Sequence, residues 1–159
     1  MRKEELNGCT LEQIRKAYCL TRVDLQRISG VSKEAVKSVE LLQHKTQRGT
    51  RHTLAAALGM RVDDIDWDKT GPNARKAVVF NVQRFLRAMS EEGCKSMRTY
   101  SNRLGIASNY DIVTKLASHP GSLSRHLRFA RKLAELIGAD PLEMTYLADE
   151  DEPLRVEGA

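Results

Sequence analysis

The chain has 159 residues, of which 41% are hydrophobic and only 5% aromatic, so it can form one domain or two small ones around a buried core. Its 26 lysines and arginines outweigh 21 aspartates and glutamates, which gives a net charge of +5. Residues 149–159 contain five of the acidic residues and one arginine, so the rest of the chain carries +9. This basic body favours a polyanionic partner such as nucleic acid.

Several classes of protein are excluded by what the sequence lacks. Three cysteines, Cys9, Cys19 and Cys94, are scattered without a CxxC pair, which predicts reduced thiols rather than a disulfide framework or a zinc site. No run approaches the ~18 apolar residues of a membrane span, and the N-terminus lacks the pattern of a signal peptide, so we expect a cytoplasmic protein that does not bind membranes. The four histidines show no metal-ligand spacing, and no glycine-rich phosphate loop occurs. We therefore expect neither an enzyme nor a cofactor or metal site.

Residues 1–67 carry a series of helix-capping signals. Thr10 precedes Gln13 by three residues, as in a capping box, and predicts a first helix over 11–19. Thr21 and Ser32 predict the N-caps of the next two helices, and Gly30 marks the turn between them, because glycine tolerates the backbone conformation that ends a helix. The remaining signals are Thr50 as the cap of a fourth helix, Gly59 as its end, and a short fifth helix over 61–65.

The stretch from Leu20 to Glu40 resembles the Cro/repressor-type helix-turn-helix family of bacteria and phages. The residues that carry the resemblance are Leu20, Thr21, Leu25, Gly30, Val31, Ser32, Val36, Val39 and Glu40. The resemblance implies that Arg22 lies near a phosphate and that residues 32–40 form the recognition helix in the major groove of duplex DNA. Gln26 departs from the family, which usually has a small alanine where the two helices cross.

The outward-facing residues of this stretch are candidates for DNA contacts. Lys33 and Lys37 are suited to contact a phosphate or a guanine, and Ser32 and Ser38 could donate to either of these groups. Glu34 could accept a hydrogen bond from the amino group of cytosine. The basic loop that follows is expected to track a phosphate strand through Lys45, Gln47, Arg48, Arg51 and His52. The alternative is an ordinary solvated helix face, but the resemblance of this helix to a recognition helix favours DNA contact.

The second half repeats the order of signals seen in the first. Gly71-Pro72 breaks the chain and places a linker at 68–76. A long amphipathic helix is predicted over 78–93, a second motif over 97–119, a helix over 127–137 and a last helix from Pro141 to Ala148 after the cap Asp140. The pairs Gly30/Gly59 and Gly105/Gly138 are similarly spaced, which indicates an internal duplication whose second copy has diverged.

In the second motif the corresponding candidates for DNA contact are Arg98, Arg103, Ser108, Asn109, Tyr110 and Lys115. Asn109 has the groups to read adenine. Residues 107–117 are equally compatible with a dimerisation surface. A further basic row, Arg125, Arg128 and Lys132, is interpreted as a solvated helix face.

The sequence therefore predicts an all-α protein of two tandem five-helix helix-turn-helix domains without a sheet. The expected boundaries are a domain at 1–67, the linker at 68–76, a divergent domain at 77–148 and a disordered acidic tail at 149–159. The expected function is that of a sequence-specific transcriptional regulator, most simply a phage- or prophage-type repressor, with double-stranded DNA as its partner and a homodimer as an open alternative. The competing hypothesis is an antitoxin-like interaction module whose second half binds a partner protein.

Overall fold

The computed structural model describes residues 1–43 and 45–149, so the predicted acidic tail lies outside the described residues except for Asp149. The first half contains the 3-10 turn η1 (Lys3–Leu6), helices α1 (Leu11–Ala17), α2 (Arg22–Ser29), α3 (Lys33–Glu40) and α4 (Arg48–Ala57), and the 3-10 turn η2 (Val62–Asp64). The second half contains β1 (Ala77–Phe80), α5 (Val82–Glu91), α6 (Met97–Arg103), η3 (Ala107–Asn109), α7 (Tyr110–Ser118), η4 (Pro120–Arg125), α8 (Leu127–Ile137), η5 (Pro141–Met144) and β2 (Thr145–Ala148).

The predicted caps of the first three helices are confirmed. Thr10 and Gln13 form a reciprocal capping box at the start of α1, and Thr21 forms another with Asp24 at the start of α2. Gly30 ends α2 in the left-handed region, at φ 78°. The expectation that Thr50 caps α4 is wrong, because the helix already begins at Arg48, where the Arg51 N–H donates to the carbonyl of Gln47 over 3.1 Å.

The prediction of an all-α protein without a sheet is also wrong. Strand β1 pairs antiparallel with β2, so that Val79 lies opposite Tyr146. The run Ala77–Phe80 was expected to open a long helix, but its β-branched and aromatic side chains suit a pleated, buried surface, and helix α5 begins only after Asn81 caps it. The helix predicted over 141–148 is likewise a 3-10 turn that continues into β2. The paired residues lie at least 65 positions apart in the chain (Phe80 with Thr145), so local patterns do not reveal the pairing.

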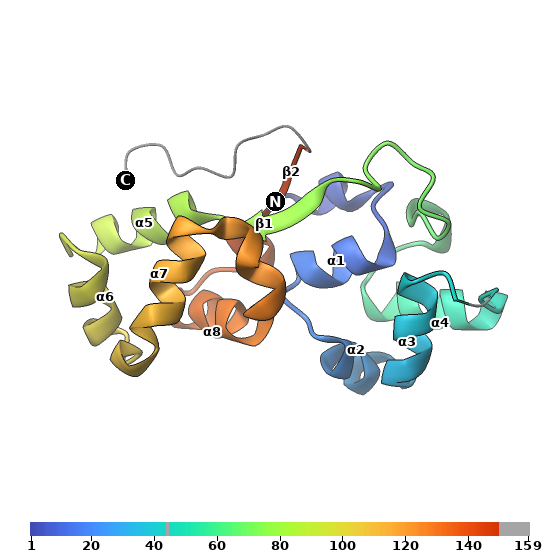
Figure 1. Ribbon diagram of the computed structural model, residues 1–159, viewed down its shortest axis with the longest axis horizontal. Coiled ribbons are helices and arrows are strands. Elements are labelled where there is room, and N and C mark those ends of the chain that lie inside the picture. Colours follow the sequence, from blue (N-terminus) through green and yellow to red (C-terminus); the bar gives the residue numbers. More distant parts are fainter. Residues whose placement is uncertain (44, 150–159) are drawn as a thin grey trace.

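The two halves meet around α1 and the small sheet (Figure 1). The Thr145 hydroxyl of β2 donates to the Ala17 carbonyl of α1 over 2.9 Å, and both groups are buried. Buried apolar side chains of the two halves, among them Ile14 and Phe80, belong to one continuous core. The halves are therefore joined by packing as well as by the chain between them.

The segment predicted as a linker lies against the first half. The Gln13 side chain donates to the carbonyls of Asn73 and Lys76 over 2.6 and 2.8 Å, which fixes the segment along α1. The Asp66 carboxylate accepts from the backbone N–H of Gly71 over 2.8 Å. The division into domains at 1–67 and 77–148 stays a prediction, as does the duplication. Among the described residues each half contains four α-helices, but in the second half the 3-10 turns η3 and η4 interrupt their order.

None of the helices within residues 1–43 and 45–149 combines the length and the apolar character needed to cross a bilayer. The three cysteines are buried and unpaired. Burial raises the pKa of the Cys19 thiol to about 12, against a small opposing effect of the Arg131 charge.

Candidate nucleic-acid interface

Helices α2 and α3 and the turn between them pack together into one unit. Leu25 and Val36 are completely buried where the two helices pack together. The Ser29 hydroxyl donates to the Leu25 carbonyl over 2.6 Å and accepts from the Val31 N–H over 3.1 Å, which closes the turn. The geometry of α3 relative to α2 is therefore fixed by both apolar packing and hydrogen bonds.

Gln26 has a specific role at this turn. Its side chain is exposed, and its Oε1 accepts from the Lys33 N–H over 2.8 Å. Ser32 caps the same helix, because its hydroxyl accepts from the Ala35 N–H over 3.1 Å. Two of the free N–H groups in the first turn of α3 are thus satisfied, one of them by a side chain of α2. The long side chain at this position holds α3 from outside and does not crowd the helix crossing.

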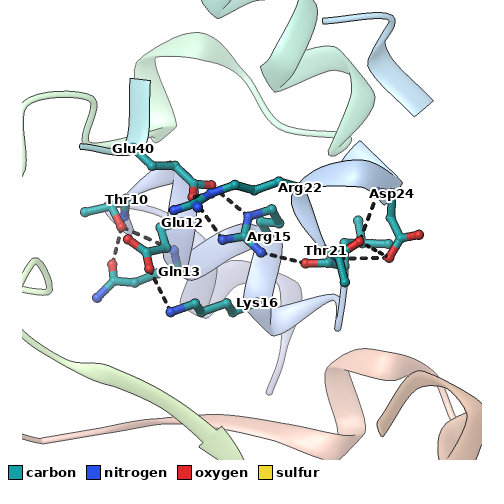
Figure 2. Close-up of polar contacts among 10 residues, drawn as sticks. Thr10, Glu12, Gln13, Arg15, Lys16, Thr21, Arg22, Asp24 and Glu40 are labelled. Carbon is teal, nitrogen blue, oxygen red and sulfur yellow. Dashed lines mark hydrogen bonds and ion pairs between the residues drawn. The ribbon is translucent and has the colours of Figure 1, made fainter. Parts of the chain in front are cut away.

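A buried ion network fixes the other end of α3 (Figure 2). Glu40 is 1% exposed, and its carboxylate accepts from Arg15 Nε and Nη2 over 2.7 and 2.9 Å. Arg22 Nε donates to the same carboxylate over 2.9 Å, and Arg15 Nη1 donates to the Leu20 carbonyl over 2.8 Å. One carboxylate therefore holds two guanidinium groups, and it links α3 to α1 and to the first residue of α2.

The exposed face of α3 carries the predicted base-reading residues. Lys33, Glu34 and Lys37 are exposed, and none of them has a side-chain ion pair among the described residues. Ser38 is half-buried, and its hydroxyl lies 3.4 Å from the Gln43 side chain. Arg22 is the one predicted DNA contact of α2, and its side chain remains 30% exposed although it binds Glu40.

The predicted phosphate contacts after α3 differ in their surroundings. Lys45 and Gln47 are exposed, and Arg48 lines a separate hollow with His52 on α4. Arg51 is engaged within the protein, because its guanidinium stacks on Trp67 at 5.4 Å and pairs with Asp68 at 3.8 Å. Arg22 is therefore associated with α3 through Glu40, whereas Arg51 is engaged with Trp67 and Asp68.

In the second half, several predicted contacts are likewise engaged in internal interactions. The Arg98 guanidinium lies over the Tyr110 ring at 4.4 Å from its centroid. Arg103 Nη1 donates to the Glu92 carbonyl over 2.7 Å. Ser108, which lies in η3, is exposed and its hydroxyl is 3.4 Å from the Asn109 side chain, whereas Lys115 is exposed on α7.

Hydrogen bonds and nearby charges act together on Asp24 at the start of α2. Burial by itself would raise the pKa of this carboxyl, but hydrogen bonds from the Thr21 N–H and hydroxyl, together with the positive charges of Arg131 and Arg128, outweigh that effect. The pKa of Asp24 consequently lies below its ordinary value. Arg131 belongs to α8 and lies 3.8 Å from the Asp24 carboxylate, so an ion pair also joins the two halves here.

The network around Glu40 contains a residue that the sequence did not single out. Arg15 lies on α1 between the buried residues Ile14 and Ala17 and is itself only 4% exposed. A charged residue on the apolar side of an amphipathic helix is the signal that would have found it, because a buried charge requires a partner.

Comparison of the chain with protein-family models, with curated proteins and with solved structures finds no match.

Proposed function

We propose that the protein is a sequence-specific, double-stranded DNA-binding transcriptional regulator, most simply a cytoplasmic repressor, with α3 as its recognition helix. The observation that carries this proposal is the exposed polar face of α3, with Lys33, Glu34 and Lys37 free of ion pairs among the described residues. The Gln26 and Glu40 contacts hold the two ends of the helix at defined positions.

The chemistry of this face suits the major groove, which admits an α-helix. Lysine ammonium groups donate to the O6 and N7 acceptors of guanine, and the Glu34 carboxylate accepts from the N4 amino group of cytosine. Arg22 adds positive charge at the first residue of α2, where it is placed to contact a phosphate while remaining bonded to Glu40. A residue pattern that combines base donors, a base acceptor and a flanking phosphate contact is what sequence-specific binding requires.

The second half has two candidate roles within this function. Either residues around 107–117 read a second DNA segment, or they form a dimerisation surface. Both roles are compatible with the exposed residues Ser108 and Lys115 of this segment. The alternative proposal is an interaction module whose second half binds a partner protein.

Selection of binding sites from random-sequence duplex DNA at two salt concentrations tests the proposal. We expect enrichment of a defined motif that persists at the higher salt concentration. A long, two-part motif would assign base reading to both halves, and a short motif would assign it to the first half alone. Binding without enrichment and with a steep salt dependence would contradict sequence-specific regulation and favour the partner-protein alternative.

A further inference from the structure

A basic groove of about 480 Å³ lies where the two halves meet. Its charged lining residues are Glu12, Arg15, Lys16, Arg22 and Lys33 from the first half and Arg128 from the second. Thr21 and Ser124 also line it, and the Thr21 hydroxyl is bonded to Asp24. The groove thus runs from the N-terminal ends of α2 and α3 in the first half to η4 and α8 in the second.

The groove cations differ in whether an anion neutralises them. Lys16 is neutralised by Glu12, whose carboxylate lies 2.7 Å from its Nζ, and Arg15 is neutralised by Glu40. Within the part of the chain that the structure describes, neither Lys33 nor Arg128 has an ion-pair partner.

Arg22 adds further positive charge to the groove. It shares the single charge of Glu40 with Arg15, so the three-residue network keeps one net positive charge at its exposed edge. Asp24 is close by; its carboxylate is held by Thr21 and faces Arg131 at 3.8 Å, and the charge of Arg128 also acts on it. The groove still carries a net positive charge, with cations from both halves.

We propose that this groove binds the phosphate backbone of the same DNA duplex that α3 reads, with Arg128 and Ser124 of the second half supplying phosphate contacts. This inference rests on the function proposed above and assigns a DNA-contacting role to α8, whether or not residues 107–117 read bases. Lys33 connects the two surfaces, because it is the first residue of α3 and also lines the groove.

The openness of the groove and its lining by several elements suit a nucleic-acid strand better than a small anion. The groove is open to solvent and is lined by residues of α1, α2, α3, η4 and α8, and an extended backbone meets such a surface along its length. An arginine can donate two parallel hydrogen bonds to one phosphate, and a serine hydroxyl can donate a third. Contacts from both halves to one strand would also resist changes in the angle between them.

The test compares the salt dependence of DNA binding for the full-length protein, Arg128→Ala and Arg87→Ala. Arg87 is the matched control, because it is an exposed arginine of the second half that does not line the groove and has only a long contact, 3.9 Å, with Glu91. We expect Arg128→Ala to lower affinity about tenfold on all sequences and to reduce the slope of log affinity against log salt by about 0.9, as loss of one phosphate contact does. Arg87→Ala is expected to change neither quantity.

Arg128→Lys provides a second readout, because it keeps the charge and should retain the wild-type slope. If Arg128→Ala binds DNA with the affinity and slope of Arg87→Ala, the groove proposal is overturned while the proposed function stands. If the wild-type protein does not bind duplex DNA at all, both proposals fail. Arg128 is exposed, so thermal unfolding of the variant is expected to match that of the wild type.

Discussion

Replacing Glu40 by glutamine perturbs the ion network that holds α3 against α1 and α2. The carboxylate accepts three charge-assisted hydrogen bonds over 2.7, 2.9 and 2.9 Å, two from Arg15 and one from Arg22. Glutamine keeps one acceptor oxygen but places an NH2 donor against a guanidinium that is only 4% exposed. Removal of one partner of a buried ion pair costs about 3–5 kcal/mol, because the other charge stays buried without compensation. We expect the free energy of unfolding to fall by about that amount.

Urea unfolding at 25 °C, followed by circular dichroism, measures this loss. Glu135→Gln is the control, since Glu135 is an exposed residue of α8 that forms no ion pair among the described residues, and its replacement should change stability by less than about 0.5 kcal/mol. The double variant Arg15→Met/Glu40→Leu should recover much of the loss, because apolar residues of similar size remove the uncompensated charge. A loss below about 1 kcal/mol for Glu40→Gln would refute the view that the buried pair holds α3 in place.

Three further predictions follow from particular contacts. The pKa of Asp24 is lowered in the folded protein, so its contribution to stability should be fully present above the ordinary aspartate pKa of about 3.9 and be lost as the pH falls through the lower folded value. Asp24→Asn should therefore flatten the pH dependence of urea unfolding in that range. A pH profile equal to that of the wild type would contradict this role of Asp24. Ser32→Ala should cost about 1 kcal/mol through loss of the α3 cap, whereas Ser32→Asp should be nearly neutral. The buried cysteines, including Cys19 with its pKa of about 12, should react with a thiol reagent only after unfolding in urea, and rapid labelling of the native protein would contradict their burial.

The parts of the fold that were predicted from the sequence depend on local chemistry. Thr10, Thr21 and Ser32 bond to groups three residues away, and Gly30 adopts its left-handed conformation within its own turn. These signals can be recognised in the sequence because the capping residue and the group that it bonds lie within one helical turn.

The parts that were missed depend on partners distant in the chain. Whether Val79 lies in a helix or a strand is decided by its pairing with Tyr146 and by its burial, neither of which alters the local pattern. Arg128 was interpreted as part of a solvated face, because only the tertiary fold brings α8 to the same groove as Arg22 and Lys33. Contacts between the two halves could not be predicted from local sequence patterns, because their partners also lie far apart in the chain.

Base reading by α3 is tested most directly by Lys37→Ala, an exposed substitution at the centre of the proposed recognition face. The measurement is the affinity of the variant and of the wild type for the selected site and for every single base-pair change in it. We expect a loss of about 1–3 kcal/mol on the selected site and a relaxed preference at one base pair only. An unchanged preference profile, with affinity equal to that of Arg87→Ala, would contradict the assignment of α3 as the recognition helix.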